Sequence, residues 1–316
     1  MTNKCIAWPI RPIFAIAAVA VAGSFTPSLA ADDIGSAMAP SGGERSAGWS
    51  PDRMQRATER VIPNVDPASV KAEIAAMDSA KDPSEAVEKT GERGQGDLYQ
   101  KPLKWVGKLF YTTPDGDYNC TAQFISPNVI LTAAQCVRDD KTGDFFTDFV
   151  FALQYKSGKY VRAYGYKCAA TKNAWVQDGN ERYAYDYATI LIDGESESGY
   201  FGTHRAWPAN AYPEAVMTAY TNGIADGGVV QAIKGAVTLY KDGVVGLNHG
   251  NKADITGAAG GAFVGSYTEG PDRNGNFVIS VDSFTYGDEP GVNYGPYLND
   301  DFKSLWDYTE NSCQNP

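Results

Sequence analysis

The chain has 316 residues, of which 43% are hydrophobic and 21% charged, and its formal net charge is −11 at pH 7. This composition is that of a globular protein with ample material for a core, and it excludes a wholly disordered chain. The acidic balance disfavours nucleic acid and anionic membranes as partners.

The first 30 residues have the features of a secretory signal peptide. Lys4 and Arg11 precede an apolar stretch from Ile13 to Val21, and Ser28-Leu29-Ala30 supplies small residues for a signal peptidase. The stretch is short for a permanent span, which leaves an uncleaved anchor as the minor alternative. Cleavage near Ala30 changes the net charge to −13, because only two positive charges leave. We therefore expect a periplasmic or secreted protein that does not bind the membrane after cleavage.

Residues 31–100 form a predicted N-terminal extension, rich in small and charged residues and poor in aromatic ones. Ser50-Pro51 predicts a helix from Pro51 to Val61, and Asp66-Pro67 predicts a second helix. Lys89 to Gly96 has the composition of a linker. Two interpretations remain open: a partly disordered exported leader, or a pro-segment that packs on the main domain.

From about Lys101 the pattern changes to short β-type runs separated by turn signals, which predicts barrels or a sandwich. Near the end, Phe302, Leu305 and Trp306 share one helical face, so a short helix is expected over about 300–313, with Asn299 or Asp300 as its cap. The predicted strands are Trp105–Tyr111, Thr121–Ile125, Asn128–Thr132, Phe149–Gln154, Ala188–Ile192, Ala215–Tyr220, Val237–Tyr240 and Phe277–Phe284.

The cysteines indicate an oxidising compartment. Cys5 leaves with the signal peptide, and the remaining four, Cys120, Cys136, Cys168 and Cys313, can pair in three ways. Neither a Cys-x-x-Cys pair nor a His/Cys cluster indicates a metal site, and we expect no metal and no cofactor.

Three ordered blocks carry a family resemblance. The first runs from Asn119-Cys120-Thr121-Ala122 to Thr132-Ala133-Ala134-Gln135-Cys136, the second is Tyr185-Asp186-Tyr187-Ala188, and the third is Thr256-Gly257-Ala258-Ala259-Gly260-Gly261-Ala262. Together they resemble the signature blocks of trypsin-like serine proteases, and within that superfamily the chain resembles secreted bacterial, glutamyl-endopeptidase-like members.

The resemblance implies an all-β fold of two six-stranded antiparallel barrels, at about 101–205 and 206–300, followed by the C-terminal helix. The trypsin-like domain then covers residues 101–316. The family pattern also pairs Cys120 with Cys136, which leaves Cys168 to pair with Cys313.

The resemblance further implies that two members of the catalytic triad have been replaced. Gln135 stands where the family has its histidine, and Ala259 stands where it has its serine, whereas Asp186 matches the triad aspartate. An amide cannot take up a proton near neutral pH, and a methyl group cannot attack a carbonyl. The positions therefore form a degenerate triad, and we expect no cleavage of peptide bonds by the triad mechanism.

Other site residues follow from the same resemblance. The backbone N–H groups of Gly257 and Ala259 match the oxyanion hole, which either still binds a carbonyl or carboxylate or is a structural relic. Ser283, Ala253 and Asp282 match positions that line the substrate cleft. Asp186 is expected to be a buried carboxylate satisfied by Gln135, Ser283 and backbone groups. The two histidines, His204 and His249, are expected to be structural.

The sequence thus predicts a non-catalytic binding or regulatory protein, with a peptide, a protease or a protease inhibitor as its partner. Two alternatives remain open: an active endopeptidase or other hydrolase with a non-standard catalytic arrangement, and a structural protein of the cell envelope. The additional change of the motif's proline to Ala262 favours natural divergence over an engineered inactive variant.

Overall fold

The computed structural model describes residues 33–40, 48–65, 98–240, 243–250, 255, 257–270, 275–311 and 313. The predicted signal peptide, the predicted helix after Asp66, the predicted linker and Ala253 lie outside these residues. Within the described part of the chain, no helix has both the length and the apolar character needed to cross a membrane.

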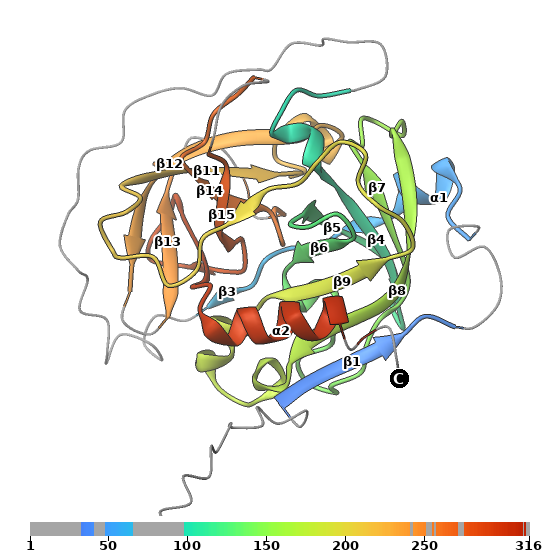
Figure 1. Cartoon of the computed structure of the whole chain (residues 1–316), viewed down its shortest axis with the longest axis horizontal. Coiled ribbons are helices and arrows are strands. Elements are labelled where there is room, and N and C mark those ends of the chain that lie inside the picture. Colours follow the sequence, from blue (N-terminus) through green and yellow to red (C-terminus); the bar gives the residue numbers. More distant parts are fainter. Residues whose placement is uncertain are drawn as a thin grey trace, which may run out of the picture. The chain divides into compact units, whose positions relative to one another are not determined.

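The first half of the domain is a closed six-stranded antiparallel barrel (Figure 1). Each strand pairs with its neighbour in the order β4-β5-β6-β9-β8-β7, and β7 pairs again with β4 to close the barrel. Its strands are β4 (Val106–Thr113), β5 (Gly116–Phe124), β6 (Val129–Thr132), β7 (Thr147–Leu153), β8 (Arg162–Lys172) and β9 (Ala188–Ile192).

Alternation of side chains gives this barrel two apolar faces. In β6, Ile130 packs into the barrel interior, whereas its neighbours Val129 and Leu131 join the cluster on the outer face. This is the two-residue period of a strand buried on both sides. Strands such as β6 and β9 are therefore nearly continuous apolar runs, which is why the sequence revealed them.

The second half is a seven-stranded sheet in the order β10-β15-β14-β11-β12-β13-β17, in which β10 alone pairs in parallel. An antiparallel bridge between Phe284 and Tyr294 links the segment after β15 to β17. The predicted fold class, all-β with a short C-terminal helix, is confirmed by the closed barrel, this second sheet and the helix at the end of the domain. The strands are β10 (Gly202–Thr203), β11 (Glu214–Ala219), β12 (Gln231–Leu239), β13 (Val244–Asn248), β14 (Ala262–Gly265), β15 (Phe277–Val281) and β17 (Val292–Pro296).

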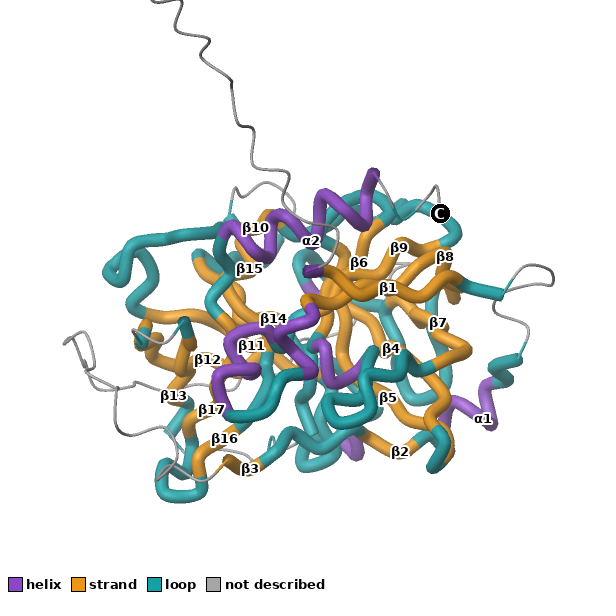
Figure 2. Tube along the Cα trace, turned by 90° about the horizontal axis from the view of Figure 1, so that it is seen from below, coloured by secondary structure: helices purple, strands orange, loops and turns teal. Residues whose placement is uncertain are grey.

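The N-terminal extension contributes strands to both halves, which the sequence did not predict. Strand β1 (Ile34–Met38) pairs with β8, β2 (Thr58–Glu59) pairs with β5, and β3 (Asn64–Val65) pairs with β16 (Thr285–Tyr286). Figure 2 shows β3 beside β16. The described parts of the extension are therefore built into the fold rather than separate from it.

The predicted helix from Pro51 to Val61 is shorter than expected. Helix α1 (Pro51–Arg56) begins as predicted, with Ser50 capping the N–H of Arg53. It ends at Arg56, because the next residues bond to β5 instead. The side-chain amide of Asn119 donates to the carbonyl of Ala57, and the backbone carbonyl of Asn119 accepts from the N–H of Arg60. A tertiary contact thus overrides the local helical signal.

Helix α2 (Asp300–Asn311) lies against the first barrel, alongside β8 and β9 (Figure 1). The side-chain oxygen of Asn299 caps it, accepting from the N–H groups of Asp301 and Phe302. A disulfide joins Cys168 in β8 to Cys313 just after the helix. The C-terminal helix is therefore fixed at both ends.

The short 3₁₀ helices of the domain lie in its loops, and two of them lead directly to site residues. They are η3 (Leu103–Trp105), η4 (Ala134–Cys136), η5 (Asn173–Val176), η6 (Asn180–Tyr185) and η7 (Ala225–Gly227).

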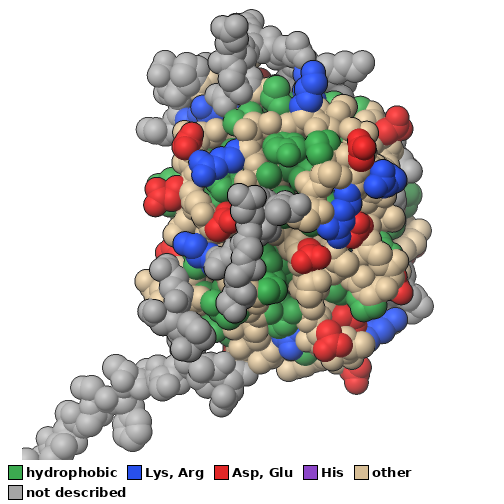
Figure 3. All heavy atoms as spheres, turned by 90° about the vertical axis from the view of Figure 1, so that its right-hand side faces the viewer, with side chains coloured by type: hydrophobic (Ala, Val, Ile, Leu, Met, Phe, Trp, Pro, Cys, Tyr) green, Lys and Arg blue, Asp and Glu red, His purple; other side chains and the backbone are tan. Residues whose placement is uncertain are grey.

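The surface drawn in Figure 3 carries interspersed acidic and basic side chains, so the acidic residues do not form one continuous patch on that face.

Candidate active site

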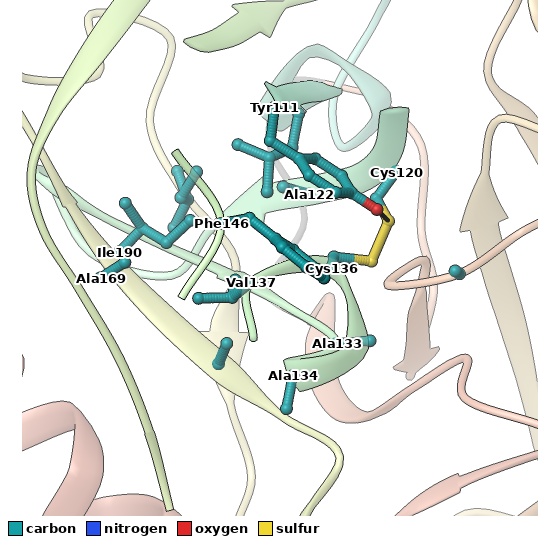
Figure 4. Packing of buried hydrophobic residues seen from close by; sticks show 14 of the residues in the cluster. Tyr111, Cys120, Ala122, Ala133, Ala134, Cys136, Val137, Phe146, Ala169 and Ile190 are labelled. Atoms are coloured by element: carbon teal, nitrogen blue, oxygen red, sulfur yellow. Dashed lines mark hydrogen bonds between the residues drawn. A yellow bond between two sulfur atoms is a disulfide. The ribbon is translucent and has the colours of Figure 1, made fainter. Parts of the chain in front are cut away.

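Gln135 and Asp186 form the centre of a buried hydrogen-bond network. Gln135 lies in η4, directly before Cys136, whose disulfide to Cys120 fixes the turn (Figure 4). Its backbone N–H donates to one carboxylate oxygen of Asp186 at 2.8 Å, and its side-chain Nε2 donates to the other at 2.8 Å. The same Nε2 donates to the carbonyl of Ser283 at 2.7 Å. Both amide hydrogens are therefore engaged with acceptors.

The Asp186 carboxylate is fully buried, which raises its pKa to about 6. Hydrogen bonds oppose this shift, first from the hydroxyl of Ser283 at 2.5 Å and then from Gln135. Three donors thus converge on one carboxylate, as buried carboxylates require. The partners are those that the sequence analysis expected.

Ala259 lies on the loop that enters β14, and its carbonyl accepts from the N–H of Thr121 at 2.9 Å. The next residue, Gly260, has a φ of +80°, and a Cβ there would lie 2.3 Å from the hydroxyl of Thr132. Only glycine fits this approach. The loop is thereby held against the residues that lead into Gln135, and Ala259 shares an apolar cluster with Ala133 and Ala134.

Asp282 belongs to a second buried polar chain, separate from Asp186. Its Oδ1 accepts from the amide of Asn293 at 2.8 Å, and Asn293 in turn contacts His249 Nε2 at 3.2 Å. Burial raises the pKa of Asp282 well above its usual value and lowers that of His249. The other histidine, His204, bonds to the hydroxyl of Tyr212 at 2.5 Å. Both histidines therefore have partners away from Asp186.

Gly257, one of the two predicted oxyanion-hole residues, lies against the carboxyl group of Glu59. A Cβ on Gly257 would lie 2.3 Å from the carboxyl carbon of Glu59. The same carboxylate accepts from the backbone N–H of Asn222, at 2.8 and 3.1 Å to its two oxygens. A side chain of the N-terminal extension thus occupies the position next to this loop.

The segment 57–65 lies beside the site and pairs with strands of both halves. Its first part pairs with β5, where Glu59 lies opposite Asn119, and its last part pairs with β16. Between them, Ile62 is 3% exposed and lies in the apolar cluster that contains Ala259 and Phe284. The carbonyl of Pro63 accepts from the N–H of Thr285 at 3.0 Å. The extension therefore reaches from the first barrel to β16 in the second half of the domain, with Ile62 in the same apolar cluster as Ala259.

At this site, Gln135 and Ala259 themselves supply neither a titrating base nor a hydroxyl group. The Gln135 side chain is a neutral amide, and Ala259 presents a methyl group. The nearby hydroxyls of Ser283 and Thr132 donate to Asp186 and to the carbonyl of Thr121. Among the described residues, no group of three or more His, Cys, Asp or Glu could hold a metal ion.

Sequence reasoning placed Gln135, Asp186, Ala259, Ser283 and Gly257 in one region, and the structure brings them together. Sequence reasoning did not anticipate Glu59, Lys108 or Asn222. Lys108 gave one signal, a charged residue within the apolar run Val106 to Phe110. Glu59 gave none, because its partner Asn222 lies 163 residues away.

The sequence matches the family model for trypsin over residues 93–297, well over half of the chain. The chain belongs to the trypsin family. Among curated proteins, none matches its sequence.

Solved structures of serine proteases share the fold at low sequence identity. A thermostable serine protease from an extremophilic microorganism is 20% identical, with a TM-score of 0.55 over 68% of this chain and 99% of that one. A Glu endopeptidase is 17% identical, with a TM-score of 0.54 over 67% and 92%. An inactivated protease paralogue of the scabies mite is 11% identical, with a TM-score of 0.50 over 66% and 96%. At these identities the likeness establishes the fold alone.

Proposed function

We propose that this trypsin-family chain is a non-catalytic protein that binds a peptide or a protein segment at the site around Gln135, Asp186 and Ala259. One observation carries the proposal: the side-chain amide of Gln135 donates both hydrogens into the Asp186 network, so the position of a catalytic base holds a structural group. Loss of single triad members typically lowers kcat by about four to six orders of magnitude, and here two positions have changed.

The retained parts favour binding over loss of all function. The disulfide beside Gln135, the buried carboxylate of Asp186 and the glycine turn after Ala259 all keep the loops of the site in place. A chain segment already pairs with strands on both sides of the site. The inactivated mite paralogue shows that a protease-like fold also occurs in an inactivated protein.

Export to the periplasm or the extracellular space is part of the proposal. Two disulfides are favoured by an oxidising compartment, and the first 30 residues resemble a signal peptide. The partner proposed is a peptide, a protease or a protease inhibitor. A relation to glutamyl endopeptidases rests on the sequence resemblance and on the fold of the Glu endopeptidase.

The proposal is tested by comparing what the natural chain retains with what a restored enzyme cuts. The natural chain is immobilised and incubated with a diverse peptide mixture, and retained peptides are identified by mass spectrometry. The double variant Gln135→His/Ala259→Ser is incubated with the same mixture, and its cleavage sites are mapped.

We expect the natural chain to retain intact peptides that contain the sequences cut by the double variant. Retained peptides unrelated to those cleavage sites would place binding elsewhere on the surface and favour a structural envelope protein. Cut peptides in the natural sample would favour a hydrolase with a non-standard arrangement.

A further inference from the structure

The carboxylate of Glu59 contacts Asn222 and Gly257 and lies within the electrostatic reach of Lys108, and we call these three residues the Glu59 subsite. Asn222 donates its backbone N–H to both carboxylate oxygens, at 2.8 and 3.1 Å. Gly257 packs its backbone against the carboxyl carbon, at a distance that leaves no room for a Cβ. Glu59 is only 6% exposed, so its charge lies out of water. A buried carboxylate requires donors and positive charge of this kind.

Lys108 supplies the positive charge. Its side chain is 6% exposed and extends from β4 toward the second sheet, where its Nζ lies 5.4 and 5.5 Å from the rings of Tyr155 and Tyr220. The position of a Cβ on Gly227 would be 3.2 Å from the same Nζ, so the ammonium group lies beside the turn that follows Asn222. Burial lowers the pKa of Lys108 to about 8, and the nearby charge of Glu59 opposes this.

The Glu59 subsite draws on both halves of the domain. Lys108 belongs to the first barrel, whereas Asn222 and Gly257 belong to loops of the second sheet. Glu59 itself comes from the extension and reaches the subsite through a two-residue strand. Asn119 bonds to the residues on either side of this strand: its side-chain amide donates to the carbonyl of Ala57, and its backbone carbonyl accepts from the N–H of Arg60. Because the strand is short, the charged side chain of Glu59 is the specific element of the contact.

We propose that the Glu59 subsite is a binding site for an acidic side chain of an external peptide, and that residues 57–65 occupy it as an intramolecular ligand. The inference rests on the proposed function, because it names the ligand class of the same site. A neutral side chain would give the N–H of Asn222 an uncharged acceptor and would remove a negative charge near the buried ammonium of Lys108, so the subsite selects carboxylates. External binding then requires displacement of residues 57–65.

The test uses the full-length chain and the variant Glu59→Lys, in which a second ammonium group replaces the carboxylate near Lys108. Thr58→Lys is the matched control, because Thr58 is the neighbouring residue on the exposed side of the same strand. Hydrogen exchange of residues 57–65 is followed by mass spectrometry. We expect exchange in Glu59→Lys to be at least about tenfold faster than in the natural chain, which corresponds to a loss of about 1.4 kcal/mol of protection. Thr58→Lys is expected to exchange like the natural chain.

The ligand class is tested with two labelled peptides. One has the sequence of residues 57–65, and the other differs only by Gln in place of Glu. By fluorescence anisotropy, we expect Glu59→Lys to bind the Glu peptide at least about tenfold more tightly than the Gln peptide, a difference of about 1.4 kcal/mol. The natural chain and Thr58→Lys should bind the Glu peptide more weakly than Glu59→Lys does, because their own segment competes for the site.

Three outcomes would each overturn the inference. The first is equal affinity of Glu59→Lys for the two peptides, and the second is unchanged hydrogen exchange in Glu59→Lys. The third is faster exchange of residues 57–65 in Glu59→Lys without binding of either peptide. If Glu59→Lys does not fold, Glu59→Gln removes the charge without adding one, and faster exchange of its residues 57–65 is again required. Retention of peptides regardless of acidic residues would overturn this inference while leaving the proposed binding function intact.

Discussion

At the scale of single residues, the site is a satisfied structural network. Gln135 places its backbone and side-chain N–H groups on the two oxygens of Asp186, and Ser283 adds a hydroxyl. An amide is suited to this position, because it donates two hydrogens at once and stays neutral over the whole working pH range. Gln135 and Ser283 together therefore supply three hydrogen-bond donors to the buried carboxylate.

Asp186 should make stability depend on pH. The folded protein holds this proton up to a pKa of about 6, whereas the reference pKa is 3.8. Between these values the folded state binds more protons than the unfolded chain, so the free energy of unfolding falls as pH rises, by about 3 kcal/mol in all. This fall in the free energy of unfolding is measured by denaturant unfolding between about pH 3.5 and about pH 7, a range that spans both pKa values.

The variant Asp186→Asn is the control for this prediction. It lacks the titrating proton but keeps Asp282, so the difference in unfolding free energy between the two proteins isolates Asp186. A difference that stays constant with pH, or that increases in favour of the natural chain as pH rises, would contradict the assignment.

At the scale of elements, local pattern and distant pairing decided what the sequence could reveal. Strands β6 and β9 are unbroken apolar runs and were predicted. Strand β8 was missed, because Arg162, Gly165 and Lys167 interrupt its apolar pattern. Strand β2 has two residues, and its partner on β5 lies about 60 positions away, so no local pattern could reveal it.

The candidate site divides in the same way. Gln135, Asp186 and Ala259 could be singled out because each lies in a contiguous motif a few residues long. The Glu59 subsite could not be predicted, because Glu59 and the three residues of the subsite come from four separate parts of the chain that only the fold brings together.

Helix α2 gives a prediction at this scale. Asn299 caps it by accepting from the N–H groups of Asp301 and Phe302, at 2.9 and 3.2 Å. We expect Asn299→Ala to lower the free energy of unfolding by about 1 kcal/mol, because two helix N–H groups lose their acceptor. The same change at Asn311, the last residue of the helix, should have a smaller effect. Equal losses in urea unfolding would argue against the cap.

At the scale of the whole molecule, the extension, the first barrel and the second sheet form one site. Residues 57–65 pair with β5 in the barrel and with β16 after the second sheet, and Glu59 lies against Gly257. The Cys168–Cys313 disulfide closes a loop with a sequence separation of 145 and ties α2 to the barrel. The trypsin-family fold is thus kept, and two disulfides tie its parts together.

The central claim, that the chain does not hydrolyse peptide bonds, is tested most directly by incubating the purified natural chain with a diverse peptide mixture. New peptide ends are followed over time by mass spectrometry, beside a sample of Asp186→Ala purified in the same way. We predict no products above those of the Asp186→Ala sample, because Gln135 cannot accept a proton and Ala259 cannot attack a carbonyl. Products that accumulate with the natural chain and disappear with Asp186→Ala would contradict the claim.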